Sequence, residues 1–165
     1  MKKFLGIIIL LVFIFCLKIQ ALSNVNETEY LRQGDSFLNQ AQSGMYPEFT
    51  SMYLKKAQYF YYVASKNTPP SIDALIGLGR VYMLQGKNEN AKNALFRAYS
   101  LDPYNADANF FFAQYCYENN DFEGALKYYN QALSLGYNDT AKTKEMIKKC
   151  YLKLGDEENA ENIYE

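Results

Sequence analysis

Apolar and small residues recur at helical spacing through most of this chain, and short polar or glycine-containing turns separate the recurrences. The clearest unit begins near residue 72 and holds two apolar stripes: Leu75, Leu78 and Tyr82, then Ala91, Leu95 and Ala98. Gly86 between the stripes suits the left-handed end of a helix, and Pro103 after the second stripe cannot continue one. The pattern therefore predicts two antiparallel helices over residues 72–105.

The same pattern returns at a constant interval along the chain. Equivalent positions hold small residues or proline: Ala57, Ala91 and Ala125; Ala64, Ala98 and Ala132; Gly79 and Ala113; Pro69 and Pro103. Further units follow over 106–140 and, shifted by one position after an insertion near 135–140, over 141–165, where the unit is truncated. A period of about 34 residues predicts an all-α fold in which helix hairpins stack and each buries its face on the next.

These positions resemble the tetratricopeptide repeat, whose pattern is W-x2-L-G-x2-Y, then A-x3-F, then A and P. The first copy reads Leu75-x2-Leu78-Gly79-x2-Tyr82, Ala91-x3-Leu95, Ala98 and Pro103; the second reads Phe112-Ala113-x2-Cys116, Ala125-x3-Tyr129 and Ala132; the third reads Ile147-Lys148-x2-Tyr151 and Ala160-x3-Tyr164. Leu75 and Asn109 replace the tryptophan, and Lys148 replaces the glycine. The resemblance implies a right-handed superhelical stack of antiparallel hairpins, an α-solenoid of about three to four repeats.

Residues 24–70 allow two interpretations. Ala57-x3-Tyr61, Ala64 and Pro69 fit the second helix of a degenerate first repeat, whose turn would carry extra residues near 42–50. Alternatively, residues 28–40 form only a capping helix. Both interpretations keep the segment in the stack.

Residues 1–23 have the pattern of a targeting segment. Lys2 and Lys3 precede an almost unbroken apolar run over 4–17, and Ala21-Leu22-Ser23 supplies a small-x-small site. We expect a signal peptide cleaved after Ser23 and an exported, periplasmic or secreted protein. The alternative is a retained anchor in the inner membrane, although the apolar run is shorter than the about 20 residues that a spanning helix needs. Phe15 before Cys16 argues against a lipoprotein.

The composition argues against several classes of function. The chain has 16 Tyr, 11 Phe and no His, so the commonest general base and metal ligand is missing. Removal of residues 1–23 takes away three lysines and no acids, which leaves 14 basic and 18 acidic residues and gives no electrostatic case for nucleic acid. We find no catalytic constellation, and we expect no enzyme activity, no metal and no cofactor. Cys116 and Cys150 are expected to be small buried hydrophobes, with a disulfide between neighbouring hairpins as the alternative.

The resemblance implies that first helices line a concave surface that binds peptides. The side chains on that face are Asp73, Ile76, Arg80, Met83 and Leu84, then Phe110, Phe111, Gln114, Tyr117 and Glu118, then Lys142, Glu145, Lys149 and Lys153. The contacts that we predict for a peptide are Arg80, Met83, Phe110, Phe111, Gln114, Tyr117 and Lys149. Alternatively, Phe110 and Phe111 pack against the N-terminal segment or an extra helix. Apolar side chains at 76, 110 and 111 argue against a clamp for a C-terminal carboxylate.

Two functions remain open. The first is an exported scaffold that binds a protein or peptide segment in this groove, in a cell-envelope complex. The second is a membrane-anchored structural subunit of an envelope assembly with no groove ligand. Ile163 and Tyr164 end the chain without a polar capping helix, which either promotes self-association through this end or leaves a frayed last helix.

Overall fold

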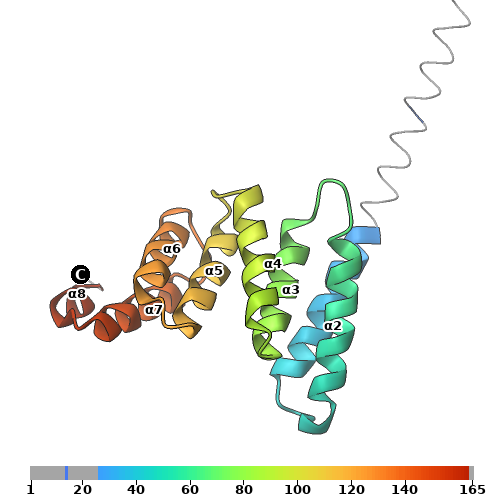
Figure 1. The fold of residues 1–165 in the computed structure, drawn as a ribbon, viewed down its shortest axis with the longest axis horizontal. Helices are drawn as coiled ribbons and strands as arrows, with labels where there is room; N and C mark the ends of the chain where they lie inside the picture. The colour runs from blue at the N-terminus through green and yellow to red at the C-terminus, as the bar shows by residue number, and fades with distance from the viewer. Residues whose placement is uncertain (1–13, 15–25, 164–165) are drawn as a thin grey trace, which may run out of the picture.

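A computed structural model describes residue 14 and residues 26–163, and all the regular elements in these residues are helical (Figure 1). Residues 26–42 are helical. The later elements are η1 (Pro47–Phe49), α2 (Thr50–Ala64), α3 (Ile72–Leu84), α4 (Asn88–Leu101), α5 (Ala106–Glu118), α6 (Phe122–Ser134), α7 (Thr140–Leu154) and α8 (Glu157–Asn162).

Successive helices pair into hairpins that follow one another along the stack (Figure 1). The pairs α3–α4, α5–α6 and α7–α8 lie in the units over 72–105, 106–140 and 141–165. Before them, the helix over 26–42 pairs with α2, through contacts such as the Tyr61 hydroxyl with Asp35. The predicted all-α stack of antiparallel hairpins is confirmed.

Side-chain caps fix where the helices begin. The side chains of Ser71, Asn105, Asp121, Asp139 and Asp156 each accept a hydrogen bond from the backbone N–H three positions later. These bonds satisfy donors that have no partner within the helix. Asn120 is the equivalent of Gly86 in the next repeat and, like it, adopts a left-handed φ, of 64° against 69°. The turn geometry is therefore repeated even where the glycine is not.

The repeated small residues lie where helices approach most closely. The alanines at 57, 91, 125 and 160 and at 64, 98 and 132 are all fully buried. At Gly79 even a Cβ atom would overlap the side chain of Leu95. Larger residues at these positions would separate the helices and lose close packing. The repeat period of the sequence thus marks the positions at which successive helices contact each other.

Among the helices of the described residues, none is both long enough and apolar enough to cross a bilayer. The predicted targeting segment over 1–23 lies outside the described residues apart from residue 14, and so do Tyr164 and Glu165 at the C-terminal end.

Candidate peptide-binding groove

Two adjoining pockets run across the first helices of successive hairpins. The larger, of about 240 Å³, is lined by Leu31, Asp35, Tyr61, Asp73, Ile76, Gly77, Arg80, Asp107 and Phe111. The smaller, of about 150 Å³, is lined by Gln42, Arg80, Met83, Leu84, Phe111, Gln114, Glu118 and Lys142. Because they share Arg80 and Phe111, we treat the two pockets as one groove. It spans the helix over 26–42, α3, α5 and the start of α7.

A cation–aromatic stack forms the middle of the groove. The guanidinium carbon of Arg80 lies 4.7 Å from the centre of the Phe111 ring. Phe111 in turn meets the ring of Phe110 edge to face at 5.3 Å. A stack of this kind contributes about 0.5–2 kcal/mol, depending on its exposure to water. This contact places the Arg80 guanidinium over the Phe111 ring in the middle of the groove.

One end of the groove is acidic. Asp35, Asp73 and Asp107 line the larger pocket, where Arg80 is the only basic residue among those that line it. Asp35 accepts a hydrogen bond of 2.7 Å from the Tyr61 hydroxyl. Burial raises the pKa of Asp73, and the negative charges of Asp107, Asp35 and Glu27 raise it further. This end of the groove therefore favours a positive charge.

The other end mixes apolar and amide groups. Met83 and Leu84 lie beside Gln114, whose side-chain amide donates to Glu118 at 3.0 Å. The Lys142 ammonium lies 5.6 Å from the centre of the Phe110 ring. This end offers apolar surface together with the amides of Gln42 and Gln114 and charges of both signs.

Residues 82–144 match the tetratricopeptide repeat family model. These residues form tetratricopeptide repeats, and the stack as a whole has the tetratricopeptide fold.

Solved structures with the same fold include a crystal structure of MamA, which is 21% identical with a TM-score of 0.60 over 72% of this chain and 68% of that one. The Sgt2 TPR domain from Aspergillus fumigatus is 19% identical, with a TM-score of 0.57 over 75% of this chain and 80% of that one. No curated protein matches the sequence. At these identities the likeness shows the tetratricopeptide fold alone.

Four of the seven predicted contacts line this tetratricopeptide groove: Arg80, Met83, Phe111 and Gln114. Phe110 instead lies in the core, 1% exposed, with its ring stacked 4.1 Å from that of Tyr137. Phe110 therefore contacts Phe111 edge to face but is not itself exposed in the groove.

The remaining two predicted contacts lie away from the two pockets. Tyr117 packs against the ring of Phe122 at 5.5 Å. Lys149 pairs with Glu145 across 2.6 Å on the surface of α7. Helical spacing places residues 110, 111, 114 and 117 on one side of α5. Tyr137, in the turn between α6 and α7, stacks on Phe110 and covers it.

Sequence reasoning missed part of the acidic end. Asp35, Tyr61 and Asp107 were not among the expected lining residues, although Asp73 was. A signal existed for Asp107, since it stands one repeat after Asp73 and in the same position of a first helix. No comparable signal existed for Asp35, because the inserted residues break the register of the first unit.

The two cysteines of the described repeats are free thiols in the core. Burial raises the pKa of Cys116 to about 12, with help from Asp121, and raises that of Cys150 to about 11. Thiols in this state are poor nucleophiles because the thiolate is disfavoured. Within the described residues, no group of three or more carboxylates and thiols is arranged to hold a metal ion. The three carboxylates of the groove are therefore not such a group either.

Proposed function

We propose that this protein is an exported interaction scaffold that binds a peptide or protein segment in its groove, within a complex of the cell envelope. The tetratricopeptide fold supports a protein–protein interaction scaffold in general. The observation that carries the finer proposal is the continuous groove across successive first helices, with Arg80 and Phe111 at its centre. Catalysis forms no part of the proposal, since proteins of this family are generally non-enzymatic scaffolds.

The two ends of the groove specify the chemistry of the ligand. An apolar side chain would pack against Phe111, Met83 and Leu84 at one end. A lysine or arginine side chain would lie near Asp73 and Asp107 at the other, where it would relieve the repulsion that raises the pKa of Asp73. Acidic ligands would meet like charges there. We therefore expect a segment with an apolar anchor followed or preceded by a basic residue.

Export is part of this proposal, and the amino-acid sequence supplies the support for it. Lys2 and Lys3, followed by the apolar run over 4–17, support delivery across a membrane. Mass measurement of the mature protein distinguishes a free scaffold, which begins at Asn24, from an anchored one, which keeps Met1. Both forms would present the same groove.

Photo-crosslinking in living cells tests groove binding. A benzoyl-phenylalanine in place of Met83 reports on the groove, and one in place of Asn93, exposed on α4, reports on another face. We expect a partner that is captured from position 83 and not from position 93. The crosslinked segment, synthesised as a peptide, should then bind the purified protein in a fluorescence anisotropy titration.

Charge reversal supplies the matched control. Asp73→Lys with Asp107→Lys should weaken binding of that peptide by about tenfold or more, because like charges then meet. Glu89→Lys with Glu123→Lys makes the same charge change at equivalent first-turn positions of α4 and α6. These two carboxylates do not line the groove, so this variant should bind normally. Equal loss in both variants, or retention of binding in Phe111→Ala, would refute the proposal.

A further inference from the structure

Among the second helices of the described repeats, α4, α6 and α8 each carry an acidic residue in the first turn, and α2 does not. Met52, Lys55, Lys56, Tyr59 and Tyr62 are exposed along one side of α2, three and four positions apart. Tyr59 is 62% exposed, Tyr62 49% and Met52 41%. We call these five residues the aromatic–lysine face. It is apolar and cationic, and α2 contains no acidic residue.

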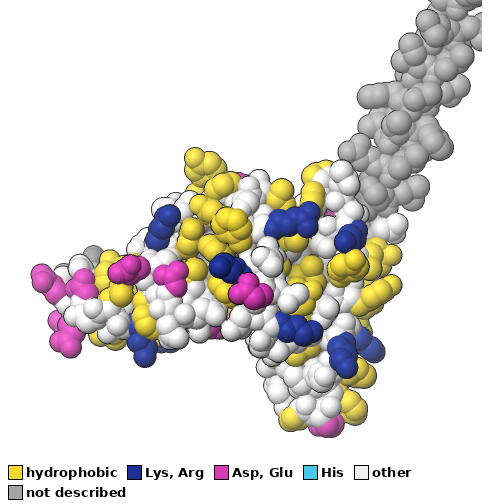
Figure 2. All heavy atoms as spheres, in the orientation of Figure 1, with side chains coloured by type: hydrophobic (Ala, Val, Ile, Leu, Met, Phe, Trp, Pro, Cys, Tyr) yellow, Lys and Arg dark blue, Asp and Glu magenta, His cyan; other side chains and the backbone are white. Residues whose placement is uncertain are grey.

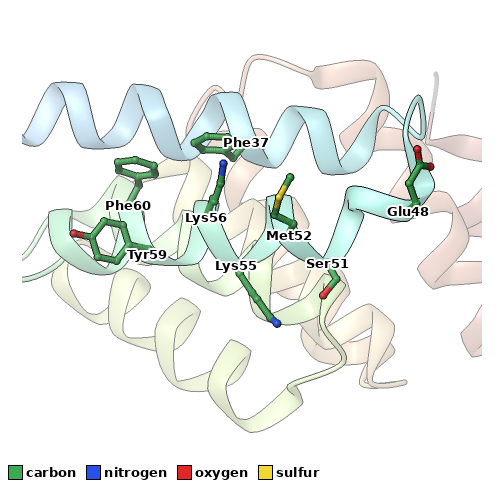
Figure 3. A pocket seen from close by; sticks show the side chains of 8 residues that line it. All are labelled: Phe37, Glu48, Ser51, Met52, Lys55, Lys56, Tyr59 and Phe60. Carbon is green, nitrogen blue, oxygen red and sulfur yellow. The ribbon is translucent and has the colours of Figure 1, made fainter.

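This face borders a hollow between α2 and the helix over 26–42 (Figure 3). The hollow, of about 680 Å³, is lined by Phe37, Glu48, Ser51, Met52, Lys55, Lys56, Tyr59 and Phe60. Phe37 and Phe60 stack at 5.7 Å, and the Lys56 ammonium lies 4.9 Å from the centre of the Phe37 ring. A pocket of this size is within the range that binds ligands.

The repeat shows that stacking does not require these side chains. One and two repeats after Lys55, the equivalent positions hold Glu89 and Glu123, and those after Tyr59 hold Asn93 and Lys127. Those after Met52 are Gly86 and Asn120. One and two repeats after Tyr62 stand Phe96, which is also exposed, and Asn130. Later hairpins thus stack without a lysine at the position of Lys55 and without a tyrosine at the position of Tyr59. The aromatic–lysine face is therefore available for a function other than folding, and exposed apolar patches of this kind mark binding sites.

The opposite end of the stack has complementary chemistry. The α8 segment, with its cap Asp156, carries four acidic residues and no basic one. Leu152 and Leu154 at the end of α7 are exposed next to it. Figure 2 shows acidic side chains gathered at the α8 end, whereas lysine and arginine side chains lie among exposed hydrophobic ones over the α2 half. Lys153 lies between these two leucines as the basic residue in the last turn of α7. Each copy therefore has an apolar cationic end at α2 and, at α8, an apolar end where four acidic residues outnumber this lysine.

We propose that the aromatic–lysine face binds the α8 end of a second copy of this chain, head to tail. Glu157, Glu158 and Glu161 would meet the lysines of α2, and the exposed leucines would cover its aromatic rings. The hollow suits a helix edge better than a flat membrane surface, because a concave site needs a protruding partner. Such a contact is heterologous, so each added copy leaves one face of each kind open and short chains of copies grow.

Sedimentation velocity of the full-length protein in mild detergent, over a wide range of protein concentration, tests this contact. We expect the mean mass to rise with concentration in the unaltered protein. Lys55→Glu with Lys56→Glu should weaken the association by about tenfold or more, and so should Glu157→Lys with Glu158→Lys, since like charges then meet. Mixing these two variants should restore association, because the unaltered α8 of the first variant then meets the unaltered α2 of the second, and the two reversed faces meet each other.

Controls separate this contact from general charge effects. Lys92→Glu with Arg97→Glu makes the same charge change on exposed positions of α4 and should associate like the unaltered protein. Circular dichroism melts show whether each variant is folded. The proposal is overturned if the unaltered protein stays monomeric, if the mixture fails to associate, or if the α4 variant loses association as fully as the α2 variant. Binding to vesicles of anionic lipid by a protein that stays monomeric would also overturn it.

Discussion

Two buried tyrosines at equivalent positions should respond in opposite ways to loss of the hydroxyl. Tyr61 and Tyr129 stand two repeats apart, in the same place of the second helix, and both rings are buried. The Tyr61 hydroxyl donates to Asp35 at 2.7 Å. The Tyr129 hydroxyl is also buried but has no hydrogen-bond partner among the described residues. Burial raises the pKa of both phenols, with the hydrogen bond to Asp35 adding to the effect at Tyr61.

The structure fixes the sign and the approximate size of each effect. Tyr61→Phe removes a hydrogen bond to a carboxylate, but Asp35 is exposed, so we expect a loss of about 1 kcal/mol in the free energy of unfolding. Tyr129→Phe removes a hydroxyl that was desolvated without a partner, so we expect a gain of about 1 kcal/mol. Ring packing persists in both variants, including the edge-to-face contact of Tyr129 with Phe110 at 5.4 Å.

Urea denaturation followed by far-ultraviolet circular dichroism measures both changes under the same conditions. The two variants should differ by about 2 kcal/mol, a difference well above the error of the midpoint when the slope is unchanged. The same ring, the same substitution and the same repeat position make each variant the control of the other. If Tyr129→Phe lowers the free energy of unfolding as Tyr61→Phe does, the view that its hydroxyl is unsatisfied is wrong.

Three further predictions concern the core. Cys116 and Cys150 should resist alkylation in the folded protein and react once urea unfolds it, as measured by mass spectrometry at each cysteine. Because their pKa values are raised to about 12 and about 11, the unfolded chain ionises first; stability should therefore fall as the pH rises above about 8.5 toward those values. Gly79→Ala should lower the free energy of unfolding by about 1–3 kcal/mol, since its Cβ would overlap Leu95. Asn93→Ala, at an exposed position of α4, should have little effect or a small stabilising one.

The fold could be predicted because the repeat period is set by positions where only small residues fit. Alanine at 91, 125 and 98 and glycine at 79 are needed wherever two helices approach closely, so their recurrence reports on the helix contacts directly. Caps such as Asp121 fix where helices begin for the same local reason. The helices of the segment over 24–70 are harder to predict, because its inserted residues shift it out of register with the later repeats.

The candidate groove could be predicted only in part. Helical spacing places Phe110 and Phe111 beside each other on α5, and nothing in the sequence says which of them is covered. The structure shows that Tyr137, from the turn after α6, stacks on Phe110 and leaves Phe111 beside Arg80.

The sequence by itself therefore determined the stack, since each repeat carries its own small residues, apolar stripes and caps. Only the tertiary structure decided which side chains the stack leaves on its surface. Burial of a given ring depends on which neighbouring hairpin lies over it, and that is a property of the packed assembly of hairpins. The acidic end of the groove arises in the same way, because packing brings Asp35, Asp73 and Asp107 from three separate helices to one pocket.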